Sequence, residues 1–257
     1  MKMKRLNTNA RNLVFQYYVG NIPAWAKASA TLCSNYAKKF GVEHQFHTDS
    51  KFSDNPYYES LRLLYDESFD EYDHILYLDA DIAPNTKENI FDYTVADVGA
   101  VLDRHSADFD VNNPKEQQLF DNMGLFYFES NAADIWVAKY GERARPRPSK
   151  SDPGMVRQIN SGVMLWSREG RIRARKEFLD YKEYMSLDFG SKQFEEFQKL
   201  DQAYYNCMFN LLDFDVTELP RKFNNHRWKL GMQDDCFMHY TEDYKGKSKR
   251  MLMEHLK

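Results

Sequence analysis

Apolar residues in the first part of the chain form short runs separated by amphipathic stretches. The runs are rich in β-branched and aromatic residues and end at Gly or Asp, which is typical of buried strands. The stretch between the first two runs is rich in Ala, carries large apolar residues about four positions apart and is followed by Gly41, as expected of a helix. The predicted elements are strands at Leu13–Val19, Val42–His47 and His74–Leu78, and helices at Ala24–Phe40 and after Pro56.

This order of strand, helix, strand, helix and strand is typical of a layered α/β fold with a mainly parallel sheet. Beyond Asp81 the alternation weakens, and a polar stretch follows from Asp103 to Gln118. Long insertions at the carboxyl ends of strands are where a ligand-binding lid is expected. The later predictions are a surface loop at Gly141–Pro153, a strand at Gln158–Trp166, helices at Arg171–Tyr184 and Ser191–Leu212, and a basic end at Lys245–Lys257.

The composition adds limits to this picture. The chain has 257 residues, of which 42% are hydrophobic and 29% charged, so one large globular domain is expected and disorder is not. The formal net charge of -4 gives no general argument for binding to nucleic acid or membranes. Three scattered cysteines exclude a disulfide framework and favour a reducing compartment. No apolar run reaches the ~18 residues of a membrane span, so we expect a cytoplasmic enzyme without its own membrane anchor.

The strongest chemical signal is a pair of aspartates. Asp79 and Asp81 follow the apolar run 74–78, with the small Ala80 between them. Side chains at positions i and i+2 of a strand point the same way, so both carboxylates can reach one ion, and hard oxygen ligands suit Mg²⁺ or Mn²⁺. Such an ion would neutralise the charge that grows on a departing diphosphate. The alternative is structural, because aspartates commonly end strands and cap turns.

Several blocks of the sequence resemble the retaining GT-A glycosyltransferases of family 8, which include glycogenin and bacterial lipooligosaccharide galactosyltransferases. The segment 72–82 is similar to the metal-binding segment of that family, and the other blocks follow in the family's order over roughly residues 10 to 250. These blocks are Asn160–Leu165, Leu200–Gln202, Leu219–Pro220 with Phe223–Asn224, and Met238–Tyr240.

The resemblance implies a role for each matching position. It implies a single GT-A domain over residues 1–257, with a donor-binding half at about 10–105 and an acceptor and catalytic half at about 106–257. Asp79, Asp81 and His239 match the ligands of Mn²⁺ (or Mg²⁺). The other matches are Lys245 on the diphosphate, Arg62 and Ser161 around the donor, Asn160 and Asp201 on the donor sugar, and Gln202 beside the reacting carbon. Tyr17 is expected near the nucleobase because nucleotides bind outside the carboxyl ends of strands, and the small Ala80 would let the donor approach the aspartates.

The chain departs from the family pattern near its end. Glu242 stands where the family has Gly, and Gly246-Lys247 replaces the usual Pro-Trp, which puts Lys245 in question. The matching residues also have structural alternatives. His239 suits a hydrogen-bonded core histidine, the run 160–162 suits a turn or bulge that enters a strand, Asp201 suits a helix cap, Gln202 suits a solvated helix residue and Lys245–Arg250 suits an exposed charged tail.

We therefore expect a retaining, hexosyltransferase-type enzyme that moves a sugar from a nucleotide diphosphate, with UDP implied by the resemblance, to a hydroxyl acceptor. Two other functions fit the pattern. An apolar strand that ends in Asp-x-Asp also occurs in aspartyl-phosphate phosphatases, although Ala83 stands where those carry Thr or Val. A non-catalytic nucleotide-sugar-binding protein would have the same fold. The basic stretch 142–150 and the basic C-terminus suit a phosphorylated, lipid-linked or nucleic-acid acceptor, or a solvated surface.

Overall fold

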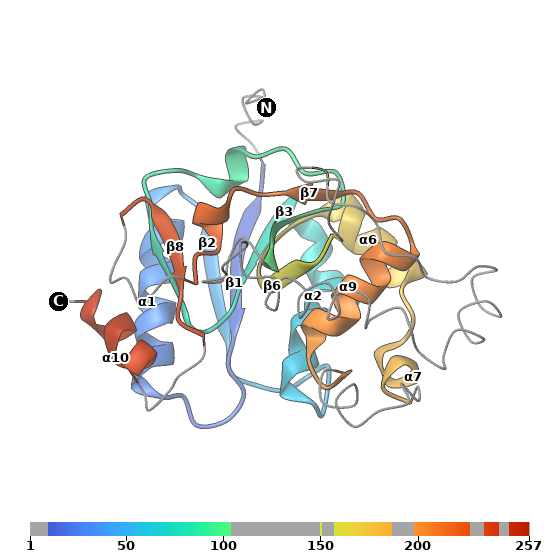
Figure 1. Cartoon of the computed structure of the whole chain (residues 1–257), viewed down its shortest axis with the longest axis horizontal. Coiled ribbons are helices and arrows are strands. Elements are labelled where there is room, and N and C mark those ends of the chain that lie inside the picture. Colours follow the sequence, from blue (N-terminus) through green and yellow to red (C-terminus); the bar gives the residue numbers. More distant parts are fainter. Residues whose placement is uncertain are drawn as a thin grey trace, which may run out of the picture.

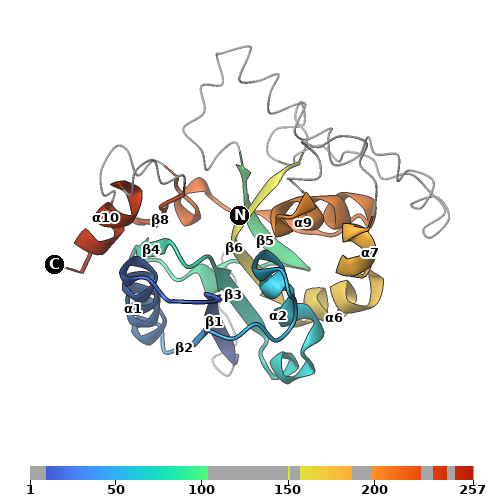
Figure 2. The same ribbon diagram turned by 90° about the horizontal axis from the view of Figure 1, so that it is seen from below.

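A central six-stranded sheet organises the protein (Figures 1 and 2). The computed structural model describes residues 10–103, 150, 157–186, 198–226, 234–241 and 247–256. The strand order is β2-β1-β3-β6-β5-β7. The strands are β1 (Asn12–Tyr17), β2 (Glu43–His47), β3 (His74–Leu78), β5 (Val98–Leu102), β6 (Ile159–Ser167) and β7 (Val216–Glu218).

The sheet is mixed and mainly parallel, as predicted. β1 pairs in parallel with β2 and β3, and β5 pairs in parallel with β7. β6 lies between β3 and β5 and runs antiparallel to both. The amino end of β6 therefore lies at the carboxyl ends of β3 and β5, which is where ligands bind in open α/β sheets.

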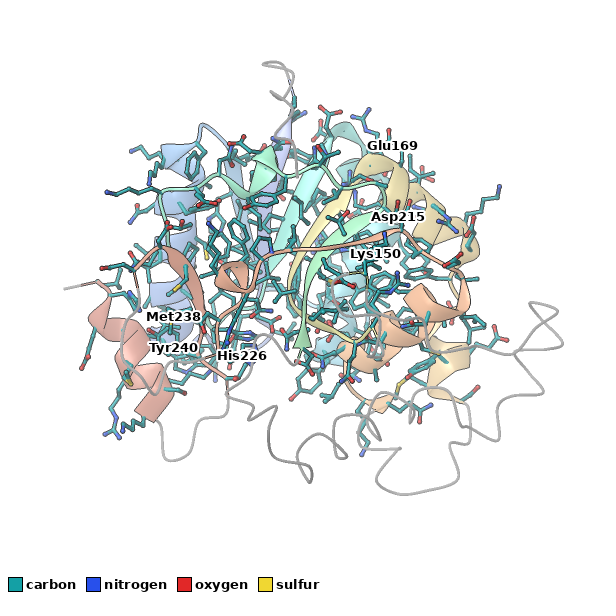
Figure 3. All side chains as sticks on the ribbon, turned by 45° about the horizontal axis from the view of Figure 1, so that its top comes forward. Lys150, Glu169, Asp215, His226, Met238 and Tyr240 are labelled. Atoms are coloured by element: carbon teal, nitrogen blue, oxygen red, sulfur yellow. The ribbon has the colours of Figure 1, made fainter. Side chains whose placement is uncertain are left out.

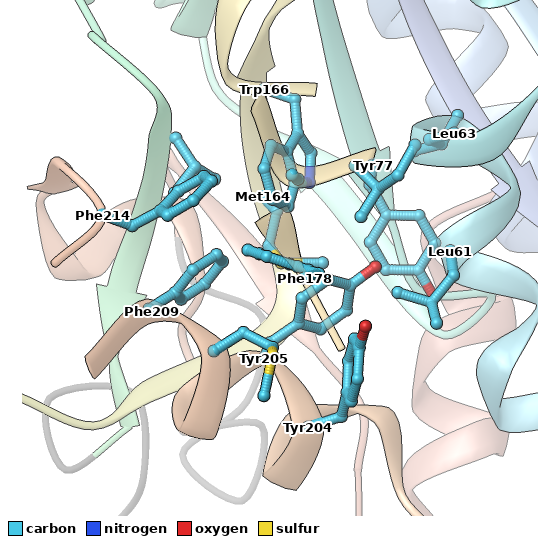
Figure 4. Close-up of a cluster of buried hydrophobic side chains, with 14 of the residues drawn as sticks. Leu61, Leu63, Tyr77, Met164, Trp166, Phe178, Tyr204, Tyr205, Phe209 and Phe214 are labelled. Atoms are coloured by element: carbon cyan, nitrogen blue, oxygen red, sulfur yellow. The ribbon is translucent and has the colours of Figure 1, made fainter. Parts of the chain in front are cut away.

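Alternate residues of each strand enter two different cores, as the pleat of a sheet requires. Leu13 and Phe15 of β1 face one hydrophobic cluster and Val14 faces the other. The first cluster lies under four helices and is rich in aromatic side chains, including Trp166 and Phe209 (Figure 4). These helices are α2 (Arg62–Tyr65), α6 (Arg168–Glu177), α7 (Tyr181–Met185) and α9 (Asp201–Leu211).

Helix α1 (Ala24–Lys39) covers the opposite face of the sheet (Figure 2). A two-stranded antiparallel sheet of β4 (Ile82–Asn85) and β8 (Cys236–His239) lies beside it. The last helix, α10 (Lys247–Glu254), packs against α1, and Leu252 joins Ala28 and Met238 in a small apolar cluster. Two distant parts of the sequence thus meet next to the end of β3. Four 3₁₀ helices complete the described elements: η1 (Pro56–Leu61), η2 (Glu67–Glu71), η3 (Ile90–Asp92) and η4 (Arg221–Phe223).

The predicted strands are confirmed, but two predicted helices are interrupted. The helix expected after Pro56 is η1 followed by the four residues of α2, and it ends because the Asp66 carboxylate accepts a hydrogen bond from the Ser68 amide. The helix expected at 171–184 is divided into α6 and α7, because Asp180 caps a new helix through the amides of Lys182 and Glu183.

Two other predicted elements differ at their ends. The helix expected at 191–212 begins at Asp201 as α9, and residues 191–197 lie outside the described part of the chain. The first strand ends at Tyr17, so Tyr18 and Val19 leave the sheet. Over the described residues, none of the helices combines the length and apolar character needed to cross a membrane.

Candidate functional site

Asp79 and Asp81 lie just beyond the end of β3, in a backbone turn that neighbouring elements hold. The Asp79 amide donates to the Gly162 carbonyl over 2.9 Å, so β6 fixes the first residue of the pair. The Gln16 side chain donates to the Asp79 carbonyl over 3.1 Å from β1. The aspartates are thus attached to both strands that flank β3.

Strand β8 brings a histidine to this pair. His239 pairs with Ile82 of β4, and the Tyr240 amide donates to the Asp81 carbonyl over 3.1 Å. As a result, His239 Nε2 lies 3.1 Å from Asp81 Oδ1 and 3.5 Å from Asp79 Oδ2. The ligand atoms of Asp79, Asp81 and His239 all lie within 4.8 Å of one another. The structure thus brings together the three residues that the resemblance assigns to the metal.

The arrangement fits a divalent cation. His239 is 2% exposed, yet its Nε2 makes no hydrogen bond within the described residues, because neither carboxylate contact has hydrogen-bond geometry. A buried polar atom without a partner is costly, and a metal ion would use its lone pair. Two carboxylates and an imidazole form a hard donor set suited to Mn²⁺ or Mg²⁺. Tyr77 Oη donates to Asp79 Oδ1 over 2.6 Å and so leaves Oδ2 facing His239 (Figure 4 shows Tyr77 in the apolar cluster).

Gly162 makes the space for this group. A Cβ atom at this position would lie 2.3 Å from His239 Cε1 and 2.9 Å from Asp79 Oδ2. The pairing of β5 with β6 shifts between Ala100 and Val101, which is the irregularity of a β-bulge. The turn or bulge that the sequence suggests at 160–162 is therefore present, and it lies in the site.

Opposite charges hold the carboxylate and the histidine together. Burial by itself would lower the pKa of His239, but Asp81 and Asp79 raise it to about 9. Burial by itself would raise the pKa of Asp81, but His239 and Lys249 outweigh this effect and hold it well below its ordinary value. Without a metal, a protonated His239 therefore balances part of the negative charge.

Lys249 of α10 is a further cation that the sequence did not single out. Its ammonium group donates to Asp81 Oδ2 and, over 2.7 Å, to the Tyr240 carbonyl. It also lies 4.5 Å from the centre of the Trp25 ring, a cation–π distance. The expected diphosphate lysine, Lys245, lies outside the described residues. Figure 3 shows where Tyr240 lies on the ribbon, at the end of β8.

A cavity of about 320 Å³ opens beside the aspartates. Five of its eleven lining residues are aromatic, with Tyr17 stacked on Tyr77 at 5.9 Å and Tyr18 edge-on to Trp25 at 5.4 Å. Burial, with the carboxylates of Asp201 and Asp79, raises the pKa of Tyr17 well above its ordinary value. The lining residues are Tyr17, Tyr18, Val19, Trp25, Pro56, Tyr57, Tyr77, Asp79, Ala80, Asp81 and Asp201.

Asp201 also lines the cavity. Its two carboxylate oxygens accept hydrogen bonds from Ser60 Oγ (2.6 Å) and Ser161 Oγ (3.2 Å). Burial and the nearby Asp79 carboxylate raise the pKa of Asp201 to about 7. Asp201 is the first residue of α9, where its charge is favourable, but a helix cap would not need two serine donors from other elements.

Asn160 and Gln202, the residue after Asp201, form a hydrogen bond with each other. Asn160 Nδ2 donates to Gln202 Oε1 over 3.1 Å, and Gln202 is half-buried at the start of α9, so it is not the solvated residue of the structural alternative. Both side chains also donate to Asp103, over 3.1 and 3.2 Å. Burial raises the pKa of Asp103 to about 6. Asp103 was not among the predicted site residues, although it ends an apolar strand as Asp79 does.

Arg62 lies away from the cavity. Its guanidinium contacts Asp49 at 3.3 Å, Glu59 at 3.8 Å and Asp66 at 3.6 Å, and it ties the end of β2 to η1 and α2. The basic stretch 142–150 lies outside the described residues except for Lys150. Lys150 pairs with Asp215 at 2.6 Å on the surface near β7, as Figure 3 shows.

Comparisons with known proteins bear on the fold alone. No protein-family model and no curated protein sequence matches the chain. A solved glycosyltransferase involved in the glycosylation of the major capsid of PBCV-1 is 12% identical, with 95% of this chain and 99% of that chain covered and a TM-score of 0.51. The galactosyltransferase LgtC, solved with donor and acceptor sugar analogs, is 16% identical, with 95% of each chain covered and a TM-score of 0.47. The chain has the single-domain α/β fold of the GT-A glycosyltransferases.

Proposed function

We propose that this protein is a metal-dependent glycosyltransferase that moves a sugar from a nucleotide diphosphate, a UDP-sugar, to a hydroxyl acceptor with retention of configuration. One observation carries the proposal. The Nε2 atom of the buried His239, which has no hydrogen-bond partner among the described residues, faces Asp79 and Asp81, and these two aspartates line a cavity with aromatic side chains. The fold supports the proposal, because it places this group at the carboxyl end of a central strand.

In this proposal the three residues of the metal group hold Mn²⁺ or Mg²⁺. The ion supplies charge neutralisation for the departing nucleotide diphosphate. Asp79 and Asp81 contribute one free oxygen each, because Tyr77 and Lys249 already occupy the other oxygens. Lys249 lies close enough to the group to share in binding the diphosphate, a role that the resemblance gives to Lys245.

The donor sugar is assigned to the floor of the cavity, between the metal group and Asp201. The Asp201 carboxylate accepts side-chain hydrogen bonds from Ser60 and Ser161, and carboxylate oxygens have further lone pairs that can accept from sugar hydroxyls. Asn160 and Ser161 are assigned to hold this side of the sugar in place, which lowers the entropic part of the barrier. The nucleobase is assigned to the aromatic end of the cavity, near Tyr17 and Trp25.

Gln202 is assigned a positioning or charge-stabilising role and not that of a nucleophile. A neutral amide oxygen is a weak nucleophile, and Gln202 Oε1 already accepts from Asn160 Nδ2 and, over 3.3 Å, from the Ser161 amide. Both of its lone pairs are therefore engaged. Retention would then follow from attack of the acceptor hydroxyl on the face that the diphosphate leaves, with a diphosphate oxygen as base.

The test is a screen of purified protein with Mn²⁺ against a panel of nucleotide diphosphate sugars. Release of free nucleotide diphosphate is followed for the wild type, for Asp81→Asn and for Asp54→Asn, a control at an exposed aspartate. We expect slow, metal-dependent release from one donor, a loss of at least about 100-fold in Asp81→Asn, consistent with the size of electrostatic contributions to catalysis, and no change in the control. NMR of the transferred sugar would report its anomeric configuration.

Two outcomes would overturn the proposal. Metal-dependent hydrolysis of simple phosphate esters, without turnover of any nucleotide sugar, would indicate a phosphatase. Tight binding of a nucleotide sugar without release, in the presence of every class of acceptor tried (glycan, glycolipid, protein and modified nucleic acid), would indicate a binding protein.

A further inference from the structure

A chain of side-chain hydrogen bonds connects His239 to the residues of the donor-sugar side. His239 Nδ1 lies 2.9 Å from Asn224 Oδ1. Asn224 Nδ2 lies 2.7 Å from Asn160 Oδ1, and Asn160 Nδ2 lies 3.1 Å from Gln202 Oε1. Four residues from β8, the segment after η4, β6 and α9 therefore form one continuous row.

A backbone amide fixes the direction of this row. The Gly162 N–H donates to Asn160 Oδ1 over 3.0 Å, and a backbone N–H can only donate. The atom of Asn160 at that place must therefore be its oxygen. The atom of Asn224 that faces the same oxygen must be its NH₂ group, so the remaining atom of the Asn224 amide is its oxygen, an acceptor.

The direction of the row determines which ring nitrogen of His239 keeps its proton when the ring is neutral. Since Asn224 Oδ1 accepts, Nδ1 of His239 must be the donor. When the ring is neutral, as metal binding requires, the other nitrogen, Nε2, points between Asp81 and Asp79 with its lone pair available to a metal. His226 strengthens the arrangement, because its Nε2 lies 3.1 Å from the same Asn224 oxygen and its ring packs edge-on to His239 at 4.4 Å (Figure 3 shows His226 beside β8).

The other end of the row has the same direction. The Ser161 N–H donates to Gln202 Oε1 over 3.3 Å, which independently identifies that atom as oxygen. Asn160 Nδ2 and Gln202 Nε2 both donate to the carboxylate of Asp103. Each amide thus donates away from His239 and toward Asp103.

The row is enclosed in protein. Asn224 is fully buried, and Asn160 and His239 are 7% and 2% exposed. Rotating the Asn224 amide by half a turn would place its NH₂ against a ring N–H and its oxygen against the Asn160 oxygen. Buried polar groups that lose their partners in this way are strongly disfavoured, so the row has one stable orientation.

We infer that Asn224 is a positioning residue: it holds His239 with Nδ1 protonated and Nε2 toward the metal, and it connects this ligand to Asn160, Gln202 and Asp103. The inference rests on the proposed function for the metal and sugar roles, but the hydrogen bonds do not. It also explains why the amide and the glycine of the run 160–162 occur together. The Asn160 side chain joins Asn224 to Gln202. Gly162 donates the N–H that orients the Asn160 amide, and it has no Cβ atom to displace His239.

The experiment compares Asn224→Leu with Asn224→Asp. Leu removes both bonds, whereas Asp keeps the acceptor for His239 and loses the donor to Asn160. With Mn²⁺ alone as probe, followed by electron paramagnetic resonance, we expect Asn224→Leu to lose about 10- to 100-fold in affinity, the range found for partners of metal-bound histidines. Asn224→Asp should bind Mn²⁺ more tightly than Asn224→Leu, because it keeps the acceptor for the His239 Nδ1–H, although its second oxygen faces the Asn160 oxygen. Asn225→Leu, a buried neighbour that reaches Cys236, is the control for a general packing defect and should bind as wild type does.

A second measurement does not need the metal. In ¹⁵N-histidine-labelled, metal-free protein, His239 should show a slowly exchanging, downfield Nδ1–H resonance, assigned by its loss in His239→Gln. Failure of the wild type to bind Mn²⁺ would refute the proposed metal site and leave the row itself to the NMR test. Equal Mn²⁺ affinity in wild type and Asn224→Leu, or a wild-type His239 without the hydrogen-bonded Nδ1–H, would overturn the inference. The NMR result stands even if Asn224→Leu does not fold.

Discussion

Single residues in the site are held in states that cost stability. Asp201 and Asp103 are buried carboxylates, and burial raises the pKa of each above its ordinary value. Structural carboxylates in a folded protein are normally exposed or paired with a cation. Groups with raised pKa values at the wall of a cavity are a feature of functional sites, where strain is retained for binding or catalysis.

The pKa of Asp201 predicts how stability changes with pH. In the metal-free protein its folded pKa is about 7, above the ordinary value of 3.8. As the pH rises, the unfolded chain loses this proton first. The free energy of unfolding is therefore independent of Asp201 ionisation below about pH 4 and falls between about pH 4 and 7. Above that range the loss is complete and no longer changes with pH. Asp201→Asn should therefore be more stable than wild type by about 2–4 kcal/mol at pH 8 and nearly equal to it at pH 4.

Chemical denaturation at pH 4, 6 and 8 measures this difference. Asp54→Asn, at an exposed aspartate, is the control and should change the free energy of unfolding by less than about 0.5 kcal/mol at each pH. Parallel pH profiles for wild type and Asp201→Asn would contradict the prediction. If Asp201 holds the donor sugar, the stabilised variant should also lose transfer activity.

At the level of elements, α10 connects the end of the chain to the metal group. Its Lys249 donates to Asp81 Oδ2, and its apolar side packs on α1. A cation at this place reduces the charge that Asp81 offers to a metal. The helix therefore acts on the site through one side chain, while its other basic residues face outward.

Replacing Lys249 by Met should tighten the binding of Mn²⁺ alone. The variant removes a positive charge next to Asp81. Two unit charges about 4 Å apart interact by ~1 kcal/mol even at the dielectric constant of bulk water, so we expect a gain of at least about fivefold in affinity. Lys247→Met is the matched control, because Lys247 is an exposed lysine on the same helix. Titration with Mn²⁺ gives the affinity. An unchanged or weaker affinity in Lys249→Met would show that the lysine orients Asp81 more than it neutralises it.

The elements that sequence predicts well are those with local patterns. Strand β3 and its Asp79 and Asp81 are evident from an apolar run followed by two acids, and the run 160–162 suits a turn or bulge, which the structure shows as an irregularity in the pairing of β5 with β6. Asp103 and Asn224 were not assigned roles because their partners are distant in sequence, 57 and 64 positions from Asn160. Only the insertion of β6 between β3 and β5 and the return of β8 to β4 bring them together. The interrupted helices were missed for another reason, since each break depends on a single Asp side chain that binds backbone amides.

On the scale of the whole molecule, the two parts of the chain share one sheet. β1, β2 and β3 come from the first part, but β6 separates β3 from β5 and belongs to the second. The metal group is divided in the same way, with Asp79 and Asp81 from one part and His239 from the other. A donor-binding half at about 10–105 is therefore a region of sequence that needs the rest of the chain to complete its sheet.

This topology predicts that the protein unfolds as a unit. Removing residues beyond 105 would leave β3 and β5 without the strand between them, with two rows of unpaired backbone groups and an open core. Scanning calorimetry of the full chain should give one transition whose van't Hoff and calorimetric enthalpies agree within about 10%. Saturating Mn²⁺ should raise the temperature of that single transition. The free energy of unfolding should increase by about 2.7 kcal/mol at a Mn²⁺ concentration 100 times the dissociation constant. Asp81→Asn should show no such increase. Two separate transitions, or a shift confined to part of the enthalpy, would mean that the halves fold independently and that the metal joins parts already formed.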